Sequence, residues 1–153
     1  MIMICILLIV FVAGIDLVCK WYVDSKFKIG ETITCCKEKI VVRKVHNKGM
    51  MLNVLEKRPE IVKVCSFVAM VMALIYQMFL FTKQGRLREK IGVALISGGA
   101  LSNTFDRIKR GYVVDYIGFH FKWKKAANVT YNLGDFAIFA GTIFVLIEQL
   151  KKK

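Results

Sequence analysis

The hydrophobic positions of this chain are gathered into four runs separated by polar stretches. The runs cover about residues 1–20, 61–82, 91–107 and 133–150. Residues 1–15 and 64–81 carry no charged side chain. Elements of a soluble domain mix apolar and polar positions periodically, whereas long apolar runs are typical of membrane-spanning helices. The pattern therefore predicts four membrane-spanning helices, of which the first lacks the marks of a cleaved secretory signal.

The polar segment of about residues 21–55 predicts a small β-sheet. The stretches Thr32–Cys35 and Lys39–Val45 are rich in β-branched residues that partly alternate with polar ones, and Lys28-Ile29-Gly30 forms a turn signal. No repeat or linker divides the chain, so residues 1–153 are expected to form a single integral-membrane domain. We predict a membrane α-helical fold: a four-transmembrane-helix bundle with a small extracytoplasmic antiparallel β-sheet between helices 1 and 2.

Small residues mark the helix faces that pack together. Ala94, Gly98 and Ser102 recur at every fourth position of the third run, and Ala137 and Gly141 repeat this spacing in the fourth. Such ridges let helices approach closely in lipid.

Lysine and arginine near the ends of the runs set the expected orientation. Four of the eight residues in 83–90 are basic, and the chain ends in three lysines. By the positive-inside rule, both termini are then cytoplasmic. Segment 20–59 is also rich in lysine and arginine, so the charge asymmetry alone leaves the opposite orientation open.

Composition excludes several classes of protein. The chain is 56% hydrophobic with a mean hydropathy of +0.51, which excludes a soluble enzyme and a disordered chain. The net charge is +13, and the basic residues lie between the apolar runs. This position favours membrane lipid headgroups over nucleic acid as the partner. The five cysteines include no C-x-x-C pair and there are two histidines, so neither a disulfide scaffold nor a zinc or other metal site is expected.

In this orientation, the polar residues that intrude on the runs gather at the outer membrane face. They are Asp16, Lys20, Asn103, Asp106, Arg107, Asp115, Asn132 and Asp135. A charged side chain in the hydrocarbon costs about 2.5–3.5 kcal/mol on insertion scales, so such residues usually face a protein interior and mark function.

Asp115 and Asp135 both lie in apolar surroundings at this face. Two carboxyl groups a few ångströms apart cannot both ionise, so one keeps a proton. Such a pair supplies a general base and a general acid, which suits attack of water on an amide carbonyl.

Structural interpretations of the same residues remain open. They are an interfacial ion pair between Asp16 and Lys20, headgroup contacts by Asp106 and Arg107, a turn at Asp115, interfacial side chains at His46 and His120, and a helix N-cap at Asn132 with Asp135 in the first turn.

Five motifs together carry a family resemblance. In chain order they are Asp16 to Lys20, His46-Asn47-Lys48-Gly49, Gly98 to Arg107, Val113-Val114-Asp115-Tyr116, and Tyr131-Asn132-Leu133-Gly134-Asp135. With these motifs, the chain resembles the lipoprotein signal peptidases, the signal peptidase II family, over its whole length. Departures from the family pattern are Met50 and Met51, Ser102 for Gly, Gly134 for Ala, and Tyr116 and Tyr131 for Phe.

The resemblance implies an aspartic endopeptidase of the bacterial cytoplasmic membrane with its active site at the outer face. Asp115 and Asp135 would be the catalytic pair. The residues implied around the substrate or the pair are Asn47, Gly49, Asn103, Arg107 and Asn132, with Asp16, Lys20 and Asp106 as structural support. The implied substrate is a prolipoprotein whose cysteine carries diacylglycerol, cleaved just before that cysteine, by a monomer without cofactor.

Two other functions fit the same residues. A small membrane transport or ion-binding protein would use Asp115 and Asp135 as a proton or cation site. A catalytically weak relative would only bind lipoproteins, but both aspartates of the motifs are intact, which argues against it.

Overall fold

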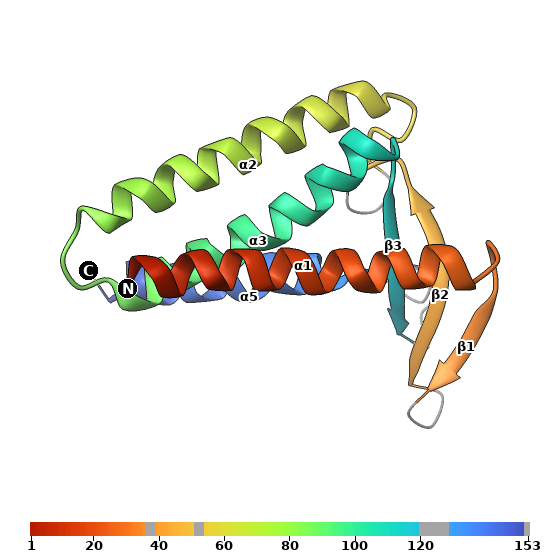
Figure 1. Ribbon diagram of the computed structural model, residues 1–153, viewed down its shortest axis with the longest axis horizontal. Coiled ribbons are helices and arrows are strands. Elements are labelled where there is room, and N and C mark those ends of the chain that lie inside the picture. Colours follow the sequence, from red (N-terminus) through yellow and green to blue (C-terminus); the bar gives the residue numbers. More distant parts are fainter. Residues whose placement is uncertain (36–38, 51–53, 120–128, 152–153) are drawn as a thin grey trace.

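The computed structural model describes residues 1–35, 39–50, 54–119 and 129–151. Four helices in these ranges form a bundle: α1 (Ile2–Lys26), α2 (Pro59–Phe81), α3 (Leu87–Lys109) and α5 (Leu133–Leu150). Figure 1 shows both termini at one end of the bundle, together with the turn between α2 and α3, and a β-sheet at the other end. The predicted fold class is confirmed.

Within the described residues, three helices are long and apolar enough to cross a membrane, namely α1, α2 and α5. The remaining helix, α3, contacts all three and lies at the centre of the bundle. Because its neighbours cover it, α3 needs no apolar surface toward lipid, and it carries the charged residues of the site at its sheet end. Helices that face lipid need apolar side chains, whereas a helix surrounded by protein does not. This explains why α3 is the least hydrophobic of the four predicted spans.

The first helix is longer than predicted. The apolar run ends near Lys20, and this charged residue predicts the end of the span there. In the structure α1 continues to Lys26. Lys20 is fully buried against polar side chains. The charge is therefore neutralised inside the protein, and the helix continues past it towards the sheet.

The sheet takes its strands from two separate segments of the chain. Its four strands are β1 (Thr32–Cys35), β2 (Ile40–Asn47), β3 (Val113–Phe119) and β4 (Thr130–Tyr131), in the antiparallel order β1-β2-β3-β4. The strands predicted between the first two helices are β1 and β2, and the segment between α3 and α5 adds β3 and β4. The pairing brings Asn47 opposite Val113 and Val45 opposite Asp115.

The alternating sides of β3 have different roles. Val114 and Tyr116 pack against Val23 of α1 in a small core. Val113 and Asp115 therefore point to the opposite face, where they line a cavity. One strand thus anchors the sheet to the bundle and presents a carboxyl group.

Two glycine faces let α3 approach its neighbours. The predicted face contacts α1, since a Cβ on Gly98 would lie 2.9 Å from the Val12 Cβ. A second face, which the sequence analysis missed, contacts α5: a Cβ on Gly99 would meet the carbonyl of Gly134, and one on Gly92 would lie 2.7 Å from the Gly141 carbonyl oxygen. Gly92 and Gly99 stand seven residues apart on α3, as Gly134 and Gly141 do on α5. This spacing is the sequence signal for the second face.

Substituting Gly99→Ala is expected to lower the thermal unfolding midpoint of the protein in detergent. The added methyl group would meet backbone that has no room to move, and overpacking of this kind costs about 1–3 kcal/mol. Gly14→Ala is the matched control, because a Cβ there meets nothing within 4 Å. Equal midpoints for the two variants would contradict the close approach of α3 and α5.

Candidate active site

A cavity of about 640 Å³ lies between the sheet and the first turns of α5. Its polar lining includes Asn47, Asn103, Arg107, Asp115, Thr130, Asn132, Asp135 and Thr142. Its apolar and aromatic lining includes Val113, Phe119, Val129, Tyr131, Phe136, Ile138 and Phe139. Side chains from β2, α3, β3 and the start of α5 therefore meet at one place.

Asp115 is held in the cavity wall by two amide groups. It is 3% exposed, and the Nδ2 of Asn132 donates to its Oδ1 at 2.7 Å. The Nδ2 of Asn47 donates to its Oδ2 at 2.9 Å. The turn interpretation of Asp115 is wrong, because the residue lies inside β3.

Asp135 lies in the first turn of α5, within a capping box. The side-chain oxygen of Asn132 accepts from the Asp135 backbone N–H at 2.9 Å, and Asp135 Oδ2 accepts from the Asn132 backbone N–H at 3.1 Å. The Nδ2 of Asn103 donates to Asp135 Oδ1 at 2.9 Å. The N-cap interpretation of Asn132 is confirmed, and the same side chain also binds Asp115.

The environment of Asp115 favours its neutral form. Burial raises the pKa of Asp115 to about 7, and the negative charge of Asp135 acts in the same direction. The hydrogen bonds from Asn47 and Asn132 oppose this rise because they stabilise the ionised carboxylate. The Asp115 carboxyl therefore gains or loses a proton near neutral pH, as a general acid or base requires.

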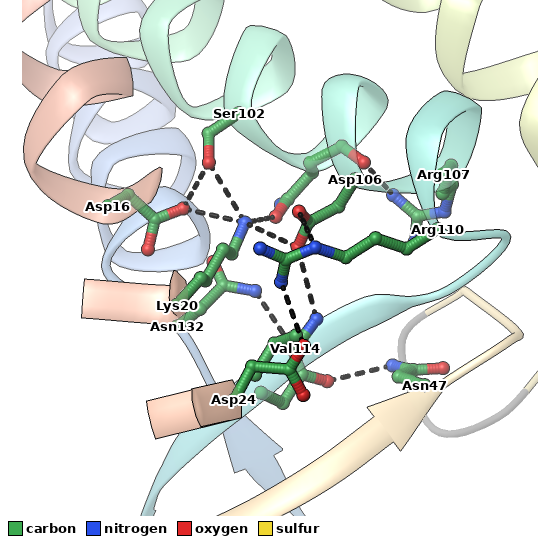
Figure 2. A network of polar contacts seen from close by, with 12 residues as sticks. Asp16, Lys20, Asp24, Asn47, Ser102, Asp106, Arg107, Arg110, Val114 and Asn132 are labelled. Carbon is green, nitrogen blue, oxygen red and sulfur yellow. Dashed lines mark hydrogen bonds and ion pairs between the residues drawn. The ribbon is translucent and has the colours of Figure 1, made fainter. Parts of the chain in front are cut away.

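A buried ion cluster lies beside the cavity (Figure 2). Lys20 and Asp16 are both fully buried, and their Nζ and Oδ2 atoms are 2.7 Å apart. The Lys20 ammonium also donates to Ser102 Oγ at 2.9 Å and to Asn103 Oδ1 at 2.7 Å. The predicted pairing of Asp16 with Lys20 is confirmed, and it connects to Asp135 through Asn103.

Asp106 joins this cluster to the sheet. It is fully buried, which excludes the headgroup contact considered for it. Its Oδ2 accepts from the Val114 backbone N–H at 3.2 Å and lies 3.8 Å from Lys20 Nζ. Asp106 therefore fixes the end of α3 against β3, next to Asp115.

Arg107 points the other way, into the cavity. Its Nη2 donates to the Gly49 carbonyl at 3.0 Å and its Nη1 lies 3.4 Å from the Asn103 carbonyl. Gly49 is not part of the cavity lining; its N–H donates to Asn47 Oδ1 at 2.9 Å and so orients that amide. Among the described residues, Arg107 Nε is buried without a hydrogen-bond partner.

Two groups of polar contacts were not found from the sequence. The hydroxyl of Tyr116 donates to Asp16 at 2.9 Å and accepts from the Leu133 N–H at 3.2 Å, so this replacement of Phe adds two polar contacts. On the outer surface, Asp24 pairs with Lys44 and His46 at 2.9 and 2.8 Å. The sequence signal for the Tyr116 contacts was a tyrosine hydroxyl inside an otherwise apolar strand.

Among the described residues, another candidate from the sequence, His46, lies away from the cavity. His46 stacks on Tyr112 with ring centroids 3.9 Å apart, outside the cavity lining. His120 and Met51 lie outside the described residues. Across the described ranges, no three His, Cys, Asp or Glu side chains form a group that would hold a metal ion.

The chain is similar to known peptidases over nearly its whole length. Residues 8–151 match the sequence model of the family described as Signal peptidase (SPase) II. The lipoprotein signal peptidase of Clostridioides difficile (strain 630) is 30% identical over 148 residues, which are 97% of this chain and 95% of that protein. The lipoprotein signal peptidase of Clostridium tetani (strain Massachusetts / E88) is 31% identical over 147 residues, 95% of this chain and 92% of that protein.

Solved structures agree with the sequence comparisons. A bacterial membrane enzyme determined by the in meso method at 2.3 Å resolution has a TM-score of 0.84 and 26% identity, covering 99% of this chain and 90% of that chain. A second one, determined at 1.9 Å, has a TM-score of 0.81 and 25% identity, covering 100% and 96%. The chain therefore belongs to the signal peptidase II family of membrane peptidases.

Proposed function

We propose that this protein is an aspartic endopeptidase that removes the signal peptide from diacylglyceryl-modified prolipoproteins, cleaving before the lipidated cysteine. The relatives above are named lipoprotein signal peptidases. The observation that carries the aspartic mechanism is that Asp115 and Asp135 line one cavity and are both bound by Asn132.

The two carboxyl groups divide the chemistry between them. With a pKa of about 7, Asp115 holds the shared proton below neutral pH and acts as the general acid. Asp135 acts as the general base that takes a proton from the attacking water. Arg107 lines the cavity, where its positive charge would stabilise a substrate carbonyl group. No metal or cofactor enters this scheme.

The cavity suits a substrate that arrives within the membrane. Phe136 and Phe139 of α5 form part of its wall, and Phe139 is 68% exposed on the surface of the bundle. An apolar wall that continues onto the lipid-facing surface lets acyl chains stay in the bilayer while the peptide reaches the two aspartates. Membrane lipids and the lipidated substrate are thus the partners of a single, monomeric domain.

The arrangement of charges supports an outer active site in the bacterial cytoplasmic membrane. Both termini and the basic turn between α2 and α3 lie at the end of the bundle opposite the sheet (Figure 1). By the positive-inside rule, this end faces the cytoplasm and the sheet and cavity face outward. In a background with the five native cysteines replaced by Ser, cysteine-labelling reagents that do not cross membranes would reach Lys39→Cys but not Arg86→Cys in intact cells.

The substrate assignment is tested with the purified protein in detergent. A prolipoprotein carrying diacylglyceryl-cysteine is expected to lose its signal peptide, seen as a mobility shift on a gel. The same prolipoprotein with Cys→Ser at the lipidated position, which cannot be modified, is expected to remain intact. Equal cleavage of both, or of neither, would contradict the proposal.

Activity is expected to fall as the pH rises through about 7. The acid form of Asp115 is required, and a carboxyl group with a raised pKa of about 7 loses its proton above that value. The measurement is kcat/KM between about pH 5 and 9, with the unfolding midpoint recorded at each pH. Activity that continues to rise above about pH 8 would contradict Asp115 as the acid.

A further inference from the structure

Three residues behind the cavity converge on the Asp16 carboxylate. Ser102 Oγ donates to Asp16 Oδ2 at 2.6 Å, and the Tyr116 hydroxyl donates to Asp16 Oδ1 at 2.9 Å. A Cβ on Gly134 would lie 2.8 Å from Asp16 Oδ2. Asp16 is fully buried, so two hydroxyl groups from α3 and β3 hold it in a space that exists because residue 134 has no side chain.

The hydroxyl of Tyr116 is a fixed donor at this place. Burial raises the pKa of Tyr116, and the neighbouring Asp16 charge acts in the same direction. Since the same oxygen accepts from the Leu133 N–H at 3.2 Å, the Tyr116 hydrogen must point to Asp16. Tyr116 thereby ties Asp16 to the first residue of α5, two positions before Asp135.

A second route leads from Asp16 to Asp135 through Lys20. The ammonium of Lys20 is a donor only, so Asn103 must turn its oxygen towards Lys20, at 2.7 Å. The amide nitrogen of Asn103 then faces Asp135, to which it donates at 2.9 Å. Asp16 and Ser102 hold the ammonium at 2.7 and 2.9 Å, so the position of Asp16 determines the orientation of the Asn103 amide.

We propose that Ser102, Tyr116 and Gly134 act together as positioning residues for the aspartate pair, by fixing Asp16 and through it both Asn103 and the start of α5. The proposal rests on the proposed function. These three residues are also positions at which the chain departs from the motifs it resembles. The two hydroxyl groups hold Asp16 in the space that a side chain at position 134 would fill.

The test compares kcat and KM of Ser102→Ala and Tyr116→Phe on a diacylated prolipoprotein. Each substitution removes one hydrogen bond to a charged group, and the expected loss is about tenfold in kcat with KM changed less than about twofold. Ser66→Ala and Tyr22→Phe are matched controls: the Ser66 hydroxyl bonds within α2 and Tyr22 is exposed on α1. Both controls should retain wild-type kcat, with all variants folded at the assay temperature.

A combined variant tests the shared space around Asp16. Gly134→Ala is expected to lower kcat and the unfolding midpoint more in the wild-type background than in the Ser102→Gly/Tyr116→Phe background, where Asp16 has lost both hydroxyl contacts and, with only the Lys20 ammonium holding it among the described residues, can shift away from the methyl group. If Gly134→Ala alone does not fold, recovery of folding in the combined variant supports the same conclusion. Equal effects in the two backgrounds would overturn the proposal.

The outcomes separate this proposal from the proposed function. A wild-type protein that cleaves, with Ser102→Ala and Tyr116→Phe unchanged in kcat, overturns the positioning role and leaves the function standing. A wild-type protein that does not cleave the diacylated substrate overturns the function and the positioning role with it.

Discussion

Replacing Asp115 or Asp135 with Asn is expected to lower kcat/KM for signal peptide release by about a thousandfold, within the range for loss of general acid–base catalysis. The substitution keeps the size of the side chain but removes its ability to exchange a proton. The proposed mechanism needs one carboxyl group of the pair as base and the other as acid, so loss of either would stop the reaction. The measurement is initial cleavage rate of a diacylated prolipoprotein at several substrate concentrations.

The same substitutions also have a predictable effect on stability. Both Asp115 oxygens accept hydrogen bonds from amide nitrogens, those of Asn47 and Asn132. Neither neighbour flips freely, because their own side-chain oxygens accept from the backbone N–H groups of Gly49 and Asp135. In Asp115→Asn one donor therefore faces another, at a cost of about 1–3 kcal/mol. The assay temperature is chosen below the lowered unfolding midpoint.

Asp24→Asn is the matched control for both variants. Asp24 lies near the same end of the bundle, but it pairs with Lys44 and His46 outside the cavity lining. Its cleavage rate is expected to stay within about threefold of wild type. Unchanged cleavage by Asp115→Asn or Asp135→Asn would reject the aspartic mechanism.

Local spacing in the sequence was sufficient for the short-range parts of the site. Asp16 and Lys20 stand four apart on a helix and pair, and Asn132 and Asp135 stand three apart and form a capping box. In both cases the helix geometry alone brings the side chains together. A structural role and a role in the site do not exclude each other for Asn132, because its side chain caps α5 and also binds Asp115.

Long-range pairing limited the rest of the prediction. The strand character of the run around Asp115 is visible in its residues, but its partner β2 lies before α2 in the chain, and nothing in either stretch specifies the other. The register that brings Asn47 to Asp115 therefore emerges only in the folded sheet. The glycine face of α3 against α5 was visible as a seven-residue spacing in each helix, but the spacing does not say which neighbour each glycine meets.

Replacing Lys20 with Met is expected to destabilise the protein strongly as well as inactivate it. Lys20 is fully buried, and its ammonium lies 2.7 Å from Asp16 Oδ2 and 3.8 Å from Asp106 Oδ2. Met has a similar length and no charge, so the substitution leaves buried carboxylates without their shared counter-ion. Removing one partner of a buried ion pair costs about 3–5 kcal/mol, mainly from the uncompensated charge that remains.

Lys63→Met is the matched control for this prediction. Lys63 pairs with Glu60 at 2.6 Å, a shorter distance than that between Lys20 and Asp16, but both side chains are exposed to the surroundings of the bundle. Exposed ion pairs contribute at most about 1 kcal/mol, so Lys63→Met should leave the unfolding midpoint nearly unchanged. Equal losses for Lys20→Met and Lys63→Met would contradict a buried, coupled cluster.

Removing the partner charge as well should recover part of the lost stability. In Lys20→Met/Asp16→Asn the buried carboxylate nearest to Lys20 is also gone, so the double variant is expected to be more stable than the sum of the two single losses implies. Activity should not recover, because Asn103 then lacks the donor that turns its amide nitrogen towards Asp135. Stability that returns without cleavage separates the two tasks of Lys20: it neutralises buried acids, and it orients the amide that holds a member of the aspartate pair.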